Sequence, residues 1–179
     1  MLTKKINPTG VIVAVLTLVF IWSQWPTKSG TKMPDEWFYL TDEKLGYEVQ
    51  FEQEPTLETI SDNGQQIQLY VMKRKGIDFM LQVITPGVSA ENEEQWLEAS
   101  KALDVDSFNG NVVLDWNFPR GGEEVHEYVL TNNIHFANQV RVIFTPDAIY
   151  KLAVAFKEKD DNELLTRILT FLDSFSLRH

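Results

Sequence analysis

Short segments in which apolar and polar residues alternate, separated by turn-forming residues, restrict the fold of this 179-residue chain more than any other feature. Tyr47-Glu48-Val49-Gln50-Phe51 has the period of two that is typical of a strand with one buried face. Asn63-Gly64 is the strongest short hairpin signal, because both residues tolerate positive φ, and Lys75-Gly76 predicts a second hairpin turn. The strands predicted in this part are residues 37–40, 47–51, 57–62, 65–74 and 77–85, and the last three form a meander.

A second group of strand-like segments lies in the C-terminal half and predicts a longer meander. The residues that separate its segments are Pro, Gly, Asn and Asp, each of which favours a turn. The predicted strands are residues 111–118, 123–131, 134–145 and 148–156.

Two segments have helical periodicity, and each follows residues that favour the start of a helix. Residues 90–103 follow Ser89, and residues 162–174 follow Asp160-Asp161. The inward-facing residues are predicted to be Trp96, Leu97, Ser100 and Leu103 in the first helix, and Leu164, Leu165, Ile168, Leu169 and Leu172 in the second. This order of elements predicts an α+β domain in which an antiparallel sheet of two meanders is covered by helices.

The N-terminal region has a different character, because Gly10 to Trp22 carries no charge. With its flanks the segment reaches the roughly 20 residues that a membrane-spanning helix needs. We therefore predict a transmembrane anchor in residues 1–25, a linker in residues 26–35 and a soluble domain in residues 36–179. The anchor residues are Val11, Val13, Leu16, Leu18, Phe20, Trp22 and Trp25. A cleaved secretory signal remains the alternative, although a good small-residue cleavage motif is missing from the usual window.

Charge predicts the orientation of the anchor and excludes one class of partner. Lys4 and Lys5 precede the apolar segment, which favours a cytoplasmic N-terminus and a periplasmic C-terminal domain at the cytoplasmic (inner) membrane. The whole chain has a net charge of −10, and its first 34 residues contain four lysines and no acid, so the domain is more negative still. Such a field repels phosphate backbones, which argues against nucleic-acid binding.

Two parts of the domain resemble the PsbP-like proteins. Gly46 to Phe51 followed by Pro55 resembles the opening strand of that family, and Tyr150 to Val154 with Phe171 to Phe175 resembles its last strand and closing helix. The resemblance covers about residues 36–178. It implies an α/β/α sandwich around a central antiparallel sheet. It also implies a mainly non-catalytic protein, since the group comprises extrinsic subunits of photosynthetic complexes, periplasmic proteins of unknown role and small chaperone-like binders.

The sequence points to no catalytic residue, metal site or cofactor. The chain has no cysteine, and it lacks a Gly-x-Ser-x-Gly elbow, a phosphate loop and a calcium loop. A two-residue turn at Asn132-Asn133 would place His126 opposite Gln139 and His135 opposite Leu130, too far apart for a metal pair without further ligands. We therefore interpret both as surface histidines.

The tryptophans suggest how such a domain acts. Trp96 fits the core, whereas Trp37 and Trp116 are candidates for a partner surface, with burial as the alternative. The first hypothesis is a non-catalytic, membrane-anchored accessory or scaffolding subunit of a larger membrane protein complex, photosynthetic or respiratory. The alternative is a tethered periplasmic ligand- or peptide-binding or chaperone module. An enzyme is the third hypothesis, and it would require His126 or His135 to meet carboxylates in a pocket.

Overall fold

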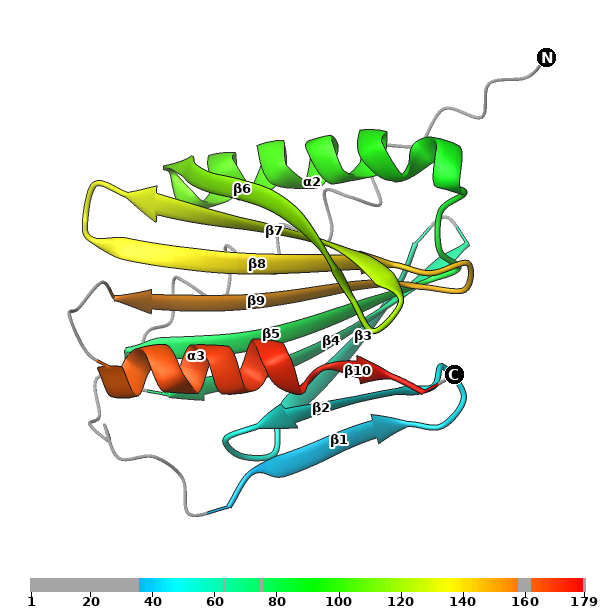
Figure 1. Ribbon diagram of the computed structural model, residues 1–179, viewed down its shortest axis with the longest axis horizontal. Coiled ribbons are helices and arrows are strands. Elements are labelled where there is room, and N and C mark those ends of the chain that lie inside the picture. The colour runs from blue at the N-terminus through cyan, green and yellow to red at the C-terminus, as the bar shows by residue number, and fades with distance from the viewer. Residues whose placement is uncertain (1–35, 63, 75, 158–161, 179) are drawn as a thin grey trace.

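The computed structural model describes residues 36–62, 64–74, 76–157 and 162–178 (Figure 1). The predicted anchor and linker, residues 1–35, lie outside this part of the chain. Within the described ranges, no helix has the length and apolar character needed to cross a membrane. The elements are β1 (Phe38–Asp42), β2 (Tyr47–Phe51), β3 (Thr56–Asp62), β4 (Gln65–Arg74), β5 (Ile77–Thr85), η1 (Ala90–Asn92), α2 (Glu93–Phe108), β6 (Gly110–Arg120), β7 (Glu123–Asn132), β8 (Phe136–Phe144), β9 (Ile149–Lys157), α3 (Asn162–Ser174) and β10 (Ser176–Leu177).

The main sheet has seven strands in the order β3-β4-β5-β9-β8-β7-β6, and all neighbouring strands are antiparallel. Both predicted meanders are present, the first as β3-β4-β5 and the second as β6 to β9. They join where β5 pairs with β9, with Leu81 opposite Leu152. The centre of the sheet therefore consists of the last strand of each meander, and β3 and β6 form its two edges.

A second, smaller sheet lies beside the main one, in the order β1-β2-β10. Tyr47 of β2 is opposite Leu177 of β10, so the end of the described chain pairs with a strand near its beginning. The strand at residues 47–51 was predicted correctly, but its separation from the meanders was not expected. The structure thus has antiparallel sheets rather than one sheet.

Two apolar cores lie on opposite faces of the main sheet. Odd-numbered residues of β5 such as Phe79 and Leu81 pack with Phe171 and Leu172 of α3. Even-numbered residues such as Met80 and Ile84 belong to the core that contains Trp96 and Phe108 of α2. The layers are therefore helix, sheet and helix, which confirms the predicted α+β architecture. We call the two sides of the sheet the α3 face and the α2 face.

The first helical segment is longer than predicted. Its residues 90–92 form the short helix η1, and α2 continues to Phe108, where Asn109 adopts a left-handed conformation with φ 49°. Asn109 ends the helix because asparagine tolerates this conformation. Leu103 is only half-buried, and Asp104 and Phe108 complete the buried face instead. The side chain of Ser89 makes no capping hydrogen bond to the backbone.

The bounds of α3 are as predicted, but its inward face is rotated. Leu165 and Leu169 are exposed, at 52% and 40% of their full accessible surface. Arg167 and Phe171 are buried in their place. The physical reason is a paired charge: Arg167 binds the carboxylate of Glu52, so a cation occupies a position that periodicity alone assigns to the outer surface.

Candidate interaction surface

The helix α2 is attached to the sheet by a buried charged cluster. Nζ of Lys151 on β9 lies 2.7 Å from Oδ1 of Asp104 and donates a hydrogen bond to Oγ of Ser100 at 2.9 Å. The hydroxyl of Tyr128 donates to Oδ2 of the same aspartate. Burial, followed by the charge of Asp104, raises the pKa of Tyr128 well above its usual value, so this hydroxyl keeps its proton. The cluster holds a helix in place and exposes no group that could act on a substrate.

Two further charged groups, both on the α3 face, attach α3 to the strands. Glu52 accepts hydrogen bonds from Arg167 of α3 and from Nη1 of Arg74 on β4, the latter at 2.8 Å. Arg141 on β8 binds Oε2 of Glu127 at 2.7 Å and the backbone oxygen of Leu172 at 2.7 Å. Since α3 has no basic residue in its own last turn, Arg141 supplies a cation where the helix dipole favours one.

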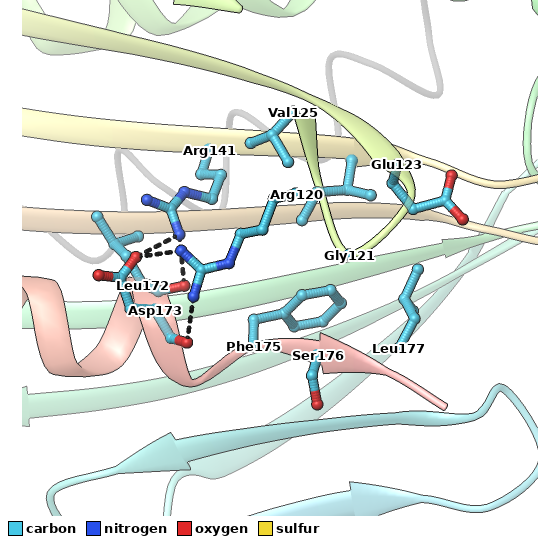
Figure 2. Close-up of a pocket in the computed structure, with 11 residues that line it drawn as sticks. Arg120, Gly121, Glu123, Val125, Arg141, Leu172, Asp173, Phe175, Ser176 and Leu177 are labelled. Atoms are coloured by element: carbon cyan, nitrogen blue, oxygen red, sulfur yellow. Dashed lines mark hydrogen bonds and ion pairs between the residues drawn. The ribbon is translucent and has the colours of Figure 1, made fainter. Parts of the chain in front are cut away.

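A pocket of about 260 Å³ lies where the β6–β7 hairpin approaches the end of α3 (Figure 2). Arg120 and Arg141 converge on Asp173 there: Nη1 of Arg120 lies 2.6 Å from Oδ1, and Nη1 of Arg141 lies 3.0 Å from it. Nη2 of Arg120 also donates to the backbone oxygen of Asp173 at 2.6 Å. Val125, Ile143, Phe175 and Leu177 provide the apolar part of the lining.

Asp78, Gln82 and Asn138 form a different polar group on the α2 face of the central strands. Asp78 and Asn138 are opposite the same residue of β9, Ala155, and each keeps a buried oxygen without a hydrogen-bond partner in the described structure. Burial raises the pKa of Asp78 to about 7, because a desolvated carboxylate is disfavoured. Among the described residues, no group of three or more His, Asp or Glu side chains is arranged to hold a metal ion.

Among the described strands of the main sheet, the edge strand β6 has the largest number of exposed apolar side chains. Residues 111–117 are all exposed. Val113 and Leu114 expose 51% and 57% of their surface, and Val112 and Trp116 expose 39% and 37%. We call Val112, Val113, Leu114 and Trp116 the β6 surface. By register Val112 lies on the α2 face, and Leu114 and Trp116 lie on the α3 face. Exposed apolar side chains among polar ones are typical of a protein interaction site.

A groove of about 470 Å³ lies between β6 and α2, and Trp116 of the β6 surface is among the residues that line it. Its lining contains five carboxylates, one lysine and one histidine: Glu93, Glu94, Glu98, Asp115, Glu124, Lys101 and His126. Nζ of Lys101 lies 2.7 Å from Oδ2 of Asp115 and 3.1 Å from Oε1 of Glu98. Carboxylates of the groove itself therefore pair with the positive charge of Lys101. The groove is therefore acidic.

Comparison with known proteins identifies the architecture. Neither a protein-family model nor a curated protein matches the chain. Among solved structures, the solution structure of cyanobacterial PsbP (CyanoP) from Synechocystis matches with a TM-score of 0.57 and 12% sequence identity, over 86% of this chain and 98% of the other. This chain has the PsbP-like fold. The likeness that short motifs at the two ends of the domain indicated is thereby confirmed at the level of the fold.

Within the PsbP-like fold, the two tryptophans predicted as a partner surface lie apart. Trp116 is exposed on β6, whereas Trp37 precedes β1 and is half-buried. Figure 1 places β1 and β6 on opposite sides of the molecule. Trp96 is a core residue as predicted, at 4% exposure and in contact with Phe144. The predicted anchor residues lie outside the described part of the chain.

The predicted pairing of the two histidines is wrong. His126 is opposite Val142 and Leu130 is opposite Asn138, because the β7–β8 turn is longer than two residues. Oδ1 of Asn132 accepts hydrogen bonds from the backbone N–H groups of Ile134 and Phe136, both at 3.1 Å. His135 lies in this turn with φ 60°, and Nδ1 of His126 lies 2.9 Å from Oδ1 of Asn117. The two histidines therefore form no joint site.

Sequence reasoning missed the rest of the β6 surface and the acidic groove. Val112, Val113 and Leu114 are three consecutive apolar residues, a run that favours a buried strand rather than an exposed one. The irregular pairing between Val112 and Leu114 breaks the alternation there. A useful signal was present in Pro119, because proline within a strand favours an edge position.

Proposed function

We propose that this protein is a non-catalytic, membrane-anchored accessory or scaffolding subunit whose extracytoplasmic PsbP-like domain binds a larger membrane protein complex through the β6 surface. The observation that carries the proposal is the exposed run of apolar side chains on β6, which includes Trp116. Tryptophan is among the residues that contribute most to protein interfaces. The described buried charged groups of Lys151, Arg167 and Arg141 attach helices to strands. Of the nine large apolar side chains that are exposed in the described structure, four lie on β6, more than on any other element.

The membrane part of the proposal is supported by sequence. The uncharged segment Gly10 to Trp22, with Lys4 and Lys5 before it, favours a single helix in the cytoplasmic (inner) membrane and a periplasmic domain. We expect the mature protein in cells to retain its first residues. N-terminal sequencing of the protein from isolated membranes tests this, and a mature chain that begins near Gly30 would contradict the anchor.

The binding part is tested by purification of the full-length chain from native membranes in mild detergent. We expect it to co-purify with a larger complex, and Trp116→Lys to abolish this association. Tyr39→Lys is the matched control, because Tyr39 is a 65% exposed aromatic residue on β1, away from the β6 surface. A wild-type chain that elutes as a monomer, or a Trp116→Lys variant that retains its partners, would contradict the proposal.

The alternative is a tethered ligand- or peptide-binding module, and the pocket between the β6–β7 hairpin and α3 favours it. Its volume of about 260 Å³ and its lining of Val125, Phe175 and Leu177 suit a small apolar group. Val125→Phe would fill this space. If ligand binding were the function, this variant would lose a co-purifying small molecule while keeping association with any complex; mass spectrometry of the denatured protein makes the distinction.

A further inference from the structure

The edge strand β6 has the geometry of an acceptor for another strand. Among the described strands it is the last of the main sheet and pairs only with β7, so no described strand pairs with the other side of its backbone. It is 11 residues long, whereas β3 at the other edge has 7. Both edges expose an acid, Glu58 on β3 and Asp115 on β6, and an edge charge opposes pairing. The apolar exposure differs, because β3 exposes Leu57 whereas β6 exposes Val113, Leu114 and Trp116.

The register of β6 assigns its side chains to two chemically different sides. Leu114 is opposite Val129 and Trp116 is opposite Glu127, which places both on the α3 face, and Trp116 at this edge also borders the acidic groove. Asp115 is opposite Tyr128 and belongs to the α2 face, beside the acidic groove. A strand added to β6 would alternate in the same way, with one set of side chains on the apolar side and the other at the acidic groove.

Two irregularities limit the part of β6 that can pair with an added strand. The register shifts between Val112 and Leu114, and Pro119 has no backbone N–H. Regular pairing is therefore available between them, from Leu114 to Phe118. An added segment would need roughly five to seven residues, which is a common strand length.

We propose that β6 accepts an extended segment of a partner protein as an additional strand, with basic side chains at the acidic groove and apolar side chains on Leu114 and Trp116. The inference rests on the proposed function and supplies the chemistry of the partner. The main-chain hydrogen bonds of such strand addition provide affinity, and the alternating side chains provide specificity.

Charge decides between this occupant and a second copy of the chain. Pairing of two β6 strands would bring together two grooves that each contain five carboxylates, on a chain with a net charge of −10. Like charges brought together at an interface are repulsive and suppress association. A basic segment of a partner protein is instead attracted to the carboxylates of the acidic groove.

The test uses the full-length chain in a non-ionic detergent and a fluorescent, capped peptide of seven residues in which valine and lysine alternate. We expect saturable binding that weakens at least tenfold when the same residues are reordered into one block of valine and one of lysine. Since alternate backbone N–H groups point to the same side, N-methylation of all lysine amides or of all valine amides separates the two edges of the peptide. If the peptide binds as a strand, one of the two N-methylated peptides should bind at least tenfold more weakly than the unmodified peptide, and the other should differ from it by less than threefold. Equal effects of the two modifications would overturn strand addition.

Variants of the protein locate the binding site. Leu114→Lys should weaken peptide binding at least tenfold, and Tyr39→Lys should leave it unchanged. The double variant Glu94→Gln/Glu98→Gln should weaken it several-fold and reduce its salt dependence, whereas Glu54→Gln/Glu58→Gln, which removes two exposed charges elsewhere, should not. Equal losses in the two double variants would show a general charge effect and overturn the inference.

The remaining outcomes separate this inference from the proposed function. If Trp116→Lys abolishes co-purification but the two N-methylated peptides behave alike, the protein binds its complex through a folded surface, and strand addition is wrong. If sedimentation shows a dimer that Leu114→Lys dissociates, the edge belongs to a second copy, and the partner chemistry is wrong.

Discussion

Strands β9 and β6 belong to the same meander, yet seven consecutive residues of β9, 149–155, are buried and seven consecutive residues of β6, 111–117, are exposed. In β9 even a lysine is neutralised inside the protein, since Lys151 pairs with Asp104. In β6 the apolar residues Val113 and Leu114 face solvent. The difference shows that position in the sheet, rather than strand composition, decides which side chains stabilise the fold and which remain available for contact.

The largest effect should come from breaking the buried ion pair of β9. Lys151→Met leaves the Asp104 carboxylate without its cation at a fully buried site, which costs about 3–5 kcal/mol of unfolding free energy. Urea unfolding followed by circular dichroism measures the loss. The double variant Lys151→Met/Asp104→Leu should recover part of it, because a buried pair is replaceable by apolar residues, whereas the buried hydroxyl of Tyr128 loses its acceptor. An equally unstable double variant would show that the pair is not the cause.

A smaller loss is expected from removing an apolar side chain of β9. Leu152 has no exposed surface and lies in the core beneath α3, so Leu152→Ala creates a cavity. The expected cost is about 2–5 kcal/mol, from lost burial and the unfilled space. The urea midpoint and slope provide the measurement; a loss well below 1 kcal/mol would mean that the central strands are less tightly packed than the structure shows.

The central strand β5 contains an acid that should make stability depend on pH. The pKa of Asp78 is raised from 3.8 to about 7, so the folded state binds a proton more tightly than the unfolded state. Stability should therefore fall as pH rises from about 4 to about 7 and then level off. Asp78→Asn should remove this slope and stabilise the protein by about 1–3 kcal/mol at pH 8. Thermal unfolding across this pH range measures it, and an unchanged slope in the variant would contradict the assignment.

The smallest effect on stability should come from a substitution on the edge strand β6. Leu114→Ala is chemically the same change as Leu152→Ala, but Leu114 exposes 57% of its surface on β6. We expect the unfolding free energy to change by no more than about 0.5 kcal/mol, as is usual for surface positions. A loss comparable to that of Leu152→Ala would show that β6 stabilises the fold, and would remove the basis for treating its surface as available for a partner.

Sequence predicted most elements of this fold because strands and turns depend on neighbouring residues. The alternation of Tyr47 to Phe51 defined β2, and Asn63-Gly64 separated β3 from β4. The β7–β8 turn was predicted incorrectly because the side chain of Asn132 binds two backbone N–H groups across it. The inward positions predicted for Leu165 and Leu169 of α3 were wrong for a related reason, since Arg167 is buried against Glu52, a partner 115 residues away.

The candidate site was predictable only in part. Trp116, between Asp115 and Asn117, was a candidate for either a contact surface or the core, and Trp37 was named beside it as a possible partner surface. The structure separates the two, because Trp37 precedes the small sheet and is half-buried, whereas Trp116 lies on a sheet edge. The carboxylates of the acidic groove come from α2, β6 and β7, and no local pattern brings them together.

The amino-acid sequence by itself determined the antiparallel strands, the two amphipathic helices, the excess of negative charge and the uncharged N-terminal segment, since each depends on composition or on spacing over a few residues. Only the tertiary structure decided that β5 pairs with β9, that Lys151 is buried and that β6 lies at an edge. The physical reason is that strand pairing joins residues far apart in the chain. A residue's exposure follows from that pairing rather than from its neighbours in sequence.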